Sequence, residues 1–596
     1  MKIAKKYVYI LLAFGLSLVF IFLINHANPT SVQAVNKYTP QTSLKDGSFK
    51  KGSAIIELNP GNNIKDFGFT KYNKINDKLN MYEVTFTGNT KQKLDDLYTN
   101  NKIKSVEPNY RCYTMDNDLT KAPNISVNNK NNKTMGAITP NDPYYPSQWA
   151  LPQLDLPDAW GMTTGTRTIV IGIIDTGIYM NYTDFNYWTN PGNVAGDPYV
   201  GDTHGWDFNY NCPLDNYSIG TDNDGGLSGV HPTNWHGTGV AGCAAAIGNN
   251  GFGLAGTSWN TELANLKVSG DANGIIWDSS VIAAINYATI MKFPIINISL
   301  GSPYANLSMQ AAIASYPGIA VCAAGNRGAF PENAAWTAAN GNNEIAPVYP
   351  ASFNLNNIVA VAASNSSDIF STSVSCYGTT SVDVAAPGET VRVYAWNGAP
   401  YQPSPGYVVS GTSFATPYAA GVIALLKAYY PYTSNAQIIN ALFTTSEKHS
   451  TEYMQIKYGR VNAYLALQHL TTISISTTKP ESADTPAPTP TPITKPIITN
   501  PPTDNQATFF QKIVMLNVSP KKITVKTKKI TVIATKGATV SISAKGLRAK
   551  VKKVKMTGTK YVFKNLNFKK VKKGAKIMVK ATLTNYIPKK IILTRK

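Results

Sequence analysis

A tight turn leading into a buried helix is predicted for Ser410-Gly-Thr-Ser413-Phe-Ala-Thr-Pro-Tyr-Ala-Ala-Gly-Val-Ile-Ala-Leu-Leu-Lys427. Gly411 is expected to give the turn a backbone conformation that is closed to other residues. Ser413 then stands at the start of the helix, where unpaired backbone N–H groups and the helix dipole favour a developing negative charge. This position suits a nucleophilic hydroxyl, although a Ser or Thr that only caps a helix is the commoner reason for such a pattern.

A serine nucleophile needs a base, and the base needs a partner that orients it. The chain has six histidines, and His236 has the most distinctive setting, Asn234-Trp-His236-Gly-Thr-Gly-Val240. The small and apolar residues that continue to Ile247 predict a second buried helix, with His236 at its entrance. His236 is therefore the candidate base.

A candidate partner for the base ends the apolar run Thr168-Ile-Val-Ile-Gly-Ile-Ile-Asp175-Thr-Gly177. A continuous apolar run that ends in an acid and a turn is typical of a central parallel strand. Open α/β sheets place their sites at the carboxyl ends of such strands. The sequence therefore predicts that Asp175 belongs to the site.

Five segments, in this order along the chain, together resemble the subtilisin-like serine proteases, or subtilases: Asp175-Thr-Gly, His236-Gly-Thr, Ile295–Ser302, Gly318–Asn326 and Gly411-Thr-Ser413. The resemblance covers residues 140–470. It implies an α/β fold of three layers around a mostly parallel sheet. One triplet alone would be weak, since Asp-Thr-Gly also suits an aspartic protease, but five segments in the family's order are specific.

The resemblance implies a role for each residue of the site. Ser413 would attack the scissile carbonyl, His236 would take its proton, and Asp175 would orient the imidazole. Asn326 and the backbone N–H of Ser413 would bind the oxyanion of the tetrahedral intermediate. Taken singly, Asp175 could be a cap and Asn326 a turn residue.

Two further segments are expected to bind the substrate. The strand Ser299-Leu300-Gly301 would pair with the substrate backbone, and Ala323-Ala324-Gly325 would form a wall of the pocket for the residue before the cut. Residues 348–351 are expected near the floor of that pocket. No carboxylate is evident there, so an apolar or aromatic residue is predicted before the scissile bond.

The segment that begins at Asn141-Asp142 resembles the N-terminal segment of mature subtilases, which a calcium ion often ties to the body of the protein. Candidate ligands are Asp142, Asp184 and Asn249 of the loop Gly248–Gly253, because hard oxygen donors suit calcium. The alternative is that Asn-Asn-Gly is simply a helix stop and a turn.

Several aspartates lie between Asp175 and His236 and are interpreted as a solvated loop, with a further metal site as the alternative: Asp197, Asp202, Asp207, Asp215, Asp222 and Asp224. The five cysteines follow no regular spacing. Cys243 and Cys322 are expected to be buried, whereas Cys212 and Cys376 are candidates for a disulfide.

Residues 1–136 are interpreted as targeting and processing segments. Residues 1–34 carry lysines and then a long apolar run, which indicates a signal peptide, with an uncleaved membrane anchor as the alternative. Residues 35–136 are predicted to be a propeptide, and residues 50–113 within it resemble the small α+β inhibitory prodomain of subtilases. Cleavage near Tyr113 and near Met135 are both consistent with the sequence.

The composition changes after the catalytic domain, which is predicted to span residues 137–470. Residues 471–508 form a linker rich in Pro and Thr. Residues 509–596 carry 25 Lys and Arg and no acid, so the net charge of +21 leaves 21 − 25 = −4 for the rest. Alternating runs predict an all-β module of immunoglobulin-like type, whose ligands would be anionic surface polymers rather than nucleic acid.

Taken together, the sequence predicts a secreted, self-processing serine endopeptidase that acts on proteins or peptides, with its own prodomain as inhibitor and structural calcium. Association with the cell surface through residues 509–596 is left open. The rival hypothesis is a surface-binding protein whose protease domain is silent. An esterase of another α/β fold would show Gly-x-Ser-x-Gly after a strand, and Ser413 lacks that context.

Overall fold

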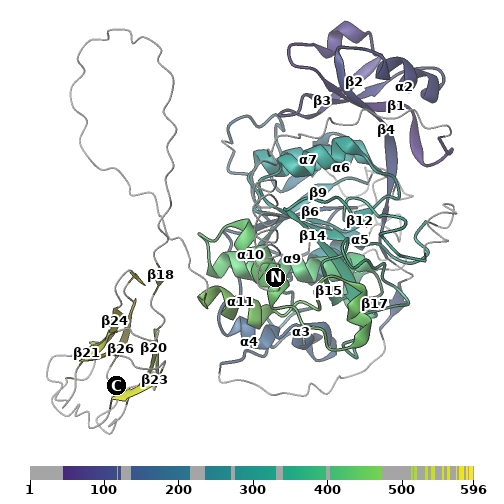
Figure 1. Cartoon of the computed structure of the whole chain (residues 1–596). Coiled ribbons are helices and arrows are strands. Elements are labelled where there is room, and N and C mark those ends of the chain that lie inside the picture. Colours follow the sequence, from purple (N-terminus) through teal and green to yellow (C-terminus); the bar gives the residue numbers. More distant parts are fainter. Residues whose placement is uncertain are drawn as a thin grey trace, which may run out of the picture. The chain divides into compact units, whose positions relative to one another are not determined.

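The computed structural model describes residues 44–116, 119–122, 136–180, 182–192, 194–214, 235–269, 275–330, 340–396 and 403–472, and short strands between 512 and 594 (Figure 1). It contains two compact units, residues 1–109 and 110–596, which are taken in turn. The predicted signal peptide and residues 473–508 of the predicted linker lie outside the described residues. No helix among the described residues is long and apolar enough to cross a bilayer.

The described part of the first unit is a small sheet with one α-helix and one short 3-10 helix, the α+β character predicted for residues 50–113. Its elements are β1 (Phe49–Leu58), β2 (Lys71–Asn76), β3 (Met81–Thr85), α2 (Thr90–Tyr98) and the first part of β4 (Ile103–Thr114). Strand β3 lies between β1 and β2, with Ile55 opposite Glu83. The side chain of Asn89 accepts a hydrogen bond from the backbone N–H of Gln92 and so caps α2.

The second unit is organised around an eight-stranded sheet in the order β15-β14-β13-β11-β6-β9-β7-β8. Every neighbouring pair from β15 to β7 is parallel, and only β8 is antiparallel. The strands are β6 (Val170–Asp175), β7 (Gly205–Asp207), β8 (Cys212–Pro213), β9 (Glu262–Lys267), β11 (Ile295–Ile298), β13 (Ile319–Ala323), β14 (Ile358–Ser364) and β15 (Val384–Pro387). The central strands are buried on both faces, which explains their continuous apolar sequences.

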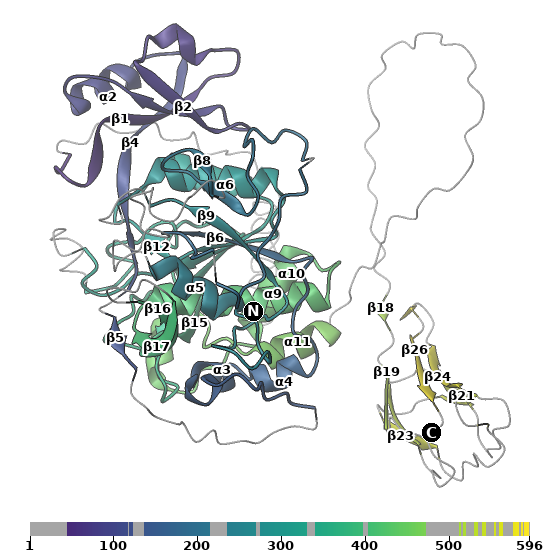
Figure 2. The ribbon, with the colours of Figure 1, turned by 180° about the vertical axis from the view of Figure 1, so that it is seen from behind.

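Helices cover both faces of this sheet and complete three layers, as predicted. Figures 1 and 2 show α6 (Asp278–Ile290) and α7 (Leu307–Ser315) on one face, and α5 (His236–Ala245) and α9 (Thr412–Tyr429) on the other. Short α3 (Ala150–Gln153) and α4 (Leu156–Trp160), with α10 (Asn435–Thr444) and α11 (Ala463–Thr472), lie on the α9 side.

Small residues let α5 and α9 lie close together. A Cβ added at Gly421 of α9 would lie 2.4 Å from the Cβ of Thr257 and 2.8 Å from the carbonyl oxygen of Ala244. Alanines and glycine in both helices therefore serve packing. This close pair holds the starts of the two helices at the same edge of the sheet.

Short strands outside the main sheet are β5 (Thr120–Lys121), β10 (Ile276–Trp277), β12 (Leu300–Gly301), β16 (Val391–Ala395) and β17 (Ser404–Val409). The strands near the C-terminus are β18 (Lys512–Ile513), β19 (Leu516–Ser519), β20 (Ile530–Ala534), β21 (Thr539–Ser543), β22 (Lys553–Lys555), β23 (Lys560–Phe563), β24 (Lys576–Thr582), β25 (Tyr586–Ile587) and β26 (Lys589–Thr594). They form two-, three- and four-stranded sheets.

Candidate active site

Three neighbouring parallel strands end at the same edge of the main sheet, and each contributes a predicted site residue. Asp175 is the last residue of β6, Ser299 directly follows β11, and Asn326 follows β13. His236 and Ser413 stand at the starts of α5 and α9. The fold therefore brings together all four residues predicted to be catalytic.

His236 and Asp175 form a buried pair. The Nδ1 atom of His236 lies 2.7 Å from Oδ1 of Asp175, and both side chains are at most 1 % exposed. The Thr176 hydroxyl accepts a hydrogen bond from the backbone N–H of Gly237 at 3.0 Å. A Cβ at Gly237 would lie 2.4 Å from the carbonyl oxygen of Gly177, so the two motifs can meet only because residue 237 is glycine.

The environment of His236 favours its protonated form. Burial alone would lower the pKa of the imidazole, but the nearby carboxylates of Asp175 and Asp116 outweigh burial, and the pKa is raised. Asp116 lies 4.0 Å from Nε2, on the side of the ring that Asp175 does not occupy. The Nε2 atom itself has no hydrogen-bond partner among the described residues.

The hydroxyl of Ser413 faces the backbone of two other segments. It donates a hydrogen bond to the carbonyl oxygen of Ser299 at 2.7 Å and accepts one from the backbone N–H of Met115 at 2.8 Å. The structure therefore does not join Ser413 directly to Nε2 of His236. Rotation about the Cα–Cβ bond of Ser413 changes which acceptor its hydroxyl faces.

A proline inside α9 explains a second contact between Ser299 and Ser413. Pro417 has no N–H, so the carbonyl of Ser413, four residues earlier, lacks its usual helical partner. The Ser299 hydroxyl donates to that carbonyl at 2.7 Å, and Asn297 donates to the same hydroxyl at 2.9 Å. The strand that was predicted to bind substrate therefore also fixes the start of α9.

Two hydrogen-bond donors predicted for the oxyanion site are the backbone N–H of Ser413 and the side-chain amide of Asn326. The backbone N–H of Ser413 donates to the Met115 carbonyl oxygen at 3.0 Å. The Oδ1 atom of Asn326 accepts hydrogen bonds from the backbone N–H and the hydroxyl of Thr412, both at 2.9 Å. This fixes the amide, whose buried Nδ2 has no partner in the described part of the chain. A free, oriented donor of this kind suits an oxyanion site.

The segment that reaches Ser413 is the end of β4. It is extended between two short strands, with Thr114 opposite Leu300 of β12 and Cys112 opposite Ile276 of β10. Beyond Asp116 the chain pairs again, because β5 lies antiparallel to β17. The chain therefore pairs with neighbouring strands on both sides of Met115, at residues 111–114 before it and at residues 120–121 after it.

Gly411 is required for space rather than for its backbone angles. Its φ of 165° is an extended conformation that any residue adopts, so the predicted special conformation is wrong. A Cβ at this position would lie 2.2 Å from the carbonyl oxygen of Met115 and 2.8 Å from the Cα of Asp116. Glycine allows the bond between residues 115 and 116 to approach the start of α9.

The Met115 side chain is buried in an apolar pocket formed by Ala323, Phe330, Val348 and Cys376. Gly301 borders it, since a Cβ there would lie 3.0 Å from Cε of Met115. The sequence interpretation had missed Phe330 and Cys376, which lie after β13 and after β14. The proposed disulfide between Cys212 and Cys376 is wrong, because Cys376 is a buried thiol.

The other predicted wall residues behave differently. Gly325 lies against the pocket, since a Cβ there would be 2.8 Å from Val348 and 3.3 Å from the Cys376 sulfur. The Ala324 side chain belongs to another apolar cluster, with Phe370 and Tyr453. Side chains alternate along a strand, so Ala323 and Ala324 cannot both face Met115.

Comparison with known proteins identifies the family. The model described as "Subtilase family" matches residues 166–463. The chain belongs to the subtilases. Thermitase of Thermoactinomyces vulgaris is 36% identical over 332 residues, which are 56% of this chain and 100% of thermitase. An extracellular protease of Xanthomonas campestris pv. campestris is 29% identical over 357 residues, 56% of this chain and 57% of the relative.

Among solved structures, fervidolysin from Fervidobacterium pennivorans has a TM-score of 0.55 at 17% identity, covering 93% of this chain and 77% of fervidolysin. That likeness concerns the fold alone. The family match and the relatives show that this subtilase is a serine endopeptidase.

The residues predicted to bind calcium in this subtilase lie in one cluster. Asp142 accepts a hydrogen bond from the backbone N–H of Asn249 at 2.6 Å. The side chain of Asn250, rather than that of Asn249, reaches Asp184 at 2.6 Å. Burial, with the Asp142 charge adding to it, raises the pKa of Asp184 to about 7. Two carboxylates and amide oxygens are donors that suit calcium.

The described part of this subtilase has no group of three or more His, Cys, Asp or Glu side chains that could hold a metal. A cation between Asp142 and Asp184 would therefore need amide and carbonyl oxygens as further ligands. The Asn249 side chain accepts from the backbone N–H of Asn141 at 3.2 Å, which ties the N-terminal segment to this loop.

The acidic loop is not uniformly solvated. Asp207 is fully buried and accepts a hydrogen bond from Nζ of Lys267 at 2.8 Å. Asp202 is buried and accepts from the Tyr287 hydroxyl. Side chains of the same chain therefore bind these two carboxylates. Residues 215–234 lie outside the described part.

Proposed function

We propose that this subtilase is a secreted endopeptidase that cuts its own chain between Met115 and Asp116. The observation that carries the proposal is the hydrogen bond of 3.0 Å from the Ser413 backbone N–H to the Met115 carbonyl oxygen. The unpaired Nδ2 of Asn326 supplies a second donor for the oxyanion site. This bond follows Met115, two residues after Tyr113, near which the first of the two processing sites is predicted.

The reaction begins when Oγ of Ser413 leaves the Ser299 carbonyl and turns to His236. Nε2 takes the hydroxyl proton as Oγ attacks the carbonyl carbon of Met115. The resulting oxyanion is stabilised by the Ser413 N–H and the Asn326 amide. Asp175 holds the Nδ1–H tautomer and stabilises the imidazolium.

The second half of the reaction releases the two parts of the chain. His236 returns its proton to the nitrogen of Asp116, and the C–N bond breaks to leave Met115 as an ester on Ser413. A water molecule, deprotonated by His236, then attacks that ester. The products are a carboxylate at Met115 and a new N-terminus at Asp116.

Other proteins and peptides would bind in the same way. The antiparallel pairing of residues 111–114 with β10 and β12 requires an extended backbone rather than a particular sequence. The pocket around Met115 would favour a large apolar residue before the cut. Before release, residues 110–116 would occupy this cleft and block it, as expected of an intramolecular inhibitor.

The further boundaries are part of this proposal. Residues 1–34 would direct export, and residues 35–136 would be removed as a propeptide, with a second cut near Met135. The mature catalytic domain would span residues 137–470, a range that contains the family match at 166–463.

The test is the mass and N-terminal sequence of the exported protein beside Ser413→Ala. We expect a wild-type fragment that begins at Asp116 or at a later residue, and a Ser413→Ala protein that remains joined. Identical cutting of both proteins would show that another protease matures the chain. An uncut wild type that hydrolyses no peptide would favour a silent surface-binding protein.

We also propose that calcium ties the segment at Asp142 to the loop that contains Asn249 and Asp184. The ion would offset the charge of the two carboxylates and hold both segments, and it would take no part in the reaction. Chelation should lower the melting temperature of Ser413→Ala protein, and Asp184→Asn should abolish that effect. An unchanged melting temperature after chelation would contradict the site.

Residues 509–596 are proposed to be an immunoglobulin-like β module that attracts anionic surface polymers. The support is the charge, 25 basic residues and no acid. Binding of the purified full-length protein to cell-wall material should weaken steeply with salt. Binding that is absent, or that salt leaves unchanged, would contradict this role.

A further inference from the structure

A buried acid, Asp278, faces residues 110–116, the segment that reaches Ser413. Counting back from the bond after Met115, Cys112 is the fourth residue. Its sulfur lies 3.0 Å from Oδ1 of Asp278, the first residue of α6. Both residues are 1 % exposed, so the thiol and the carboxyl meet in a closed site.

The carboxyl group of Asp278 is held in place from the opposite side. Nδ2 of Asn306 donates a hydrogen bond to Oδ2 at 2.7 Å. The Asn306 side chain is itself fixed, because its Oδ1 accepts from the backbone N–H of Met309 and caps α7. The acceptor that faces Cys112 therefore cannot turn away without breaking a second buried contact.

The backbone of the same segment also reaches this acid. The N–H of Tyr110 donates to the Asp278 carboxyl, and Trp277 pairs with Arg111 in the β10–β4 ladder. Burial raises the pKa of Asp278 to about 7 while the segment is bound.

A helix-capping role does not account for this arrangement. An acid in the first turn of α6 does favour the helix dipole. However, the hydrogen-bond donors to Asp278 come from Cys112, Asn306 and Tyr110, all of which lie outside α6. The carboxyl is therefore aimed at the cleft segment and at α7.

We propose that Asp278 makes this protease select a small side chain that donates a hydrogen bond, Cys, Ser or Thr, at the fourth position before the cut. The inference rests on the proposed cleavage after Met115, which defines that position. An apolar residue there would leave a buried carboxyl without its donor, and sites built around a polar partner discriminate strongly against substrates that lack it. The enclosed setting of Cys112 excludes long side chains.

The experiment uses the mature enzyme and p-nitroanilide peptides based on residues 110–115. Ser, Thr, Ala or Val replaces the cysteine in these peptides, and a tripeptide that ends in the same methionine lacks the position altogether. For wild type we expect kcat/KM to be about tenfold or more higher with Ser or Thr than with Ala or Val. Asp278→Leu should remove or reverse this preference, whereas Asp278→Asn should keep part of it.

The tripeptide distinguishes a failure of the proposed endopeptidase function from a failure of the proposed role of Asp278. It should be cut at similar rates by wild type and by both variants, since it does not reach Asp278. Two outcomes would overturn the role of Asp278 and leave the proposed function standing. In one, wild type cuts the Ser and Ala peptides at equal rates. In the other, Asp278→Asn and Asp278→Leu both show the same preference as wild type. If wild type cuts no peptide, including the tripeptide, the proposed function fails and this inference falls with it.

Discussion

At the scale of single residues, Asp116, which follows the proposed cleavage site, raises the pKa of His236, the proposed base. Asp116 lies 4.0 Å from Nε2 of His236, and its charge is one of two that raise the pKa of this imidazole. Cleavage needs neutral His236, so its rate should rise as the pH increases through that pKa. Asp116→Asn removes one raising charge, and the midpoint should therefore move to lower pH.

The measurement is the rate of self-cleavage between about pH 5 and pH 9, the range around a histidine titration. Asp116→Glu keeps a carboxylate and serves as the matched control, with a midpoint near that of wild type. A midpoint for Asp116→Asn that is unchanged or higher would show that this carboxylate does not act on His236.

The Nδ2 atom of Asn326 is expected to set the rate of turnover. Its Nδ2 is buried and unpaired among the described residues, while its Oδ1 already holds Thr412. Asn326→Ala should lower kcat on peptides by about 10²–10³-fold and change KM little, because the donor acts on the oxyanion. Steady-state kinetics on a soluble peptide would measure both values. A large rise in KM with unchanged kcat would assign Asn326 to substrate binding instead.

At the scale of elements, β11 supports the start of α9 through one hydroxyl. Ser299 donates to the carbonyl that Pro417 leaves without a helical partner. Ser299→Ala should leave this buried carbonyl unpaired and lower the free energy of unfolding by about 1–3 kcal/mol. Urea denaturation in the Ser413→Ala background would measure the change without self-digestion.

A matched control for Ser299 is available in α7. Ser308 is 1 % exposed, and its hydroxyl has no hydrogen-bond partner in the part of the chain that the structure describes. Ser308→Ala should therefore cost much less than Ser299→Ala. Equal losses for the two variants would mean that burial of a serine, rather than the contact with Ser413, sets the effect.

The elements that hold the site were predictable because their patterns are local. A continuous apolar run that ends in Asp175 predicts a buried parallel strand, and small residues after His236 and Ser413 predict buried helices. Parallel strands and the helices that follow them bring their ends to one edge. Those rules explain why the predicted site residues meet in the structure.

The remaining features depend on contacts between distant segments, which local patterns do not encode. Cys112 and Asp278 are 166 residues apart, and only the register of β4 against β10 brings them together. Phe330 and Cys376 join the Met115 pocket from loops whose paths no periodicity predicts. The need for glycine at position 411 likewise follows from the neighbouring chain, not from its own φ.

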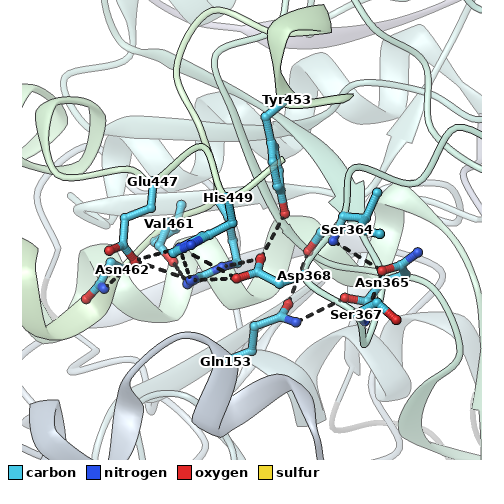
Figure 3. Close-up of polar contacts among 12 residues, drawn as sticks. Gln153, Ser364, Asn365, Ser367, Asp368, Glu447, His449, Tyr453, Val461 and Asn462 are labelled. Atoms are coloured by element: carbon cyan, nitrogen blue, oxygen red, sulfur yellow. Dashed lines mark hydrogen bonds and ion pairs between the residues drawn. The ribbon is translucent and has the colours of Figure 1, made fainter. Parts of the chain in front are cut away.

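At the scale of the whole catalytic domain, one buried arginine joins its C-terminal part to the loop after β14. Arg460 donates to both carboxyl oxygens of Asp368, at 2.8 and 3.1 Å, and to Glu447 at 3.2 Å. Figure 3 shows Asp368, Glu447 and His449 gathered around this point. Glu447 follows α10 and Arg460 precedes α11, so the ion cluster links both helices to the loop beside the main sheet.

Arg460→Met should therefore loosen this end of the domain. The arginine side chain is 4% exposed, whereas those of Asp368 and Glu447 are 25% and 30% exposed, so water would solvate the two abandoned acids in part. We expect a loss near the lower end of the range for a broken buried pair, about 3 kcal/mol, in urea denaturation of Ser413→Ala protein. Lys457→Met is the matched control, because Lys457 is 45% exposed and lies 3.7 Å from Asp383. It should cost less than about 1 kcal/mol. If the two losses were equal, Arg460 would not join these segments, and the packing of α10 and α11 alone would hold them.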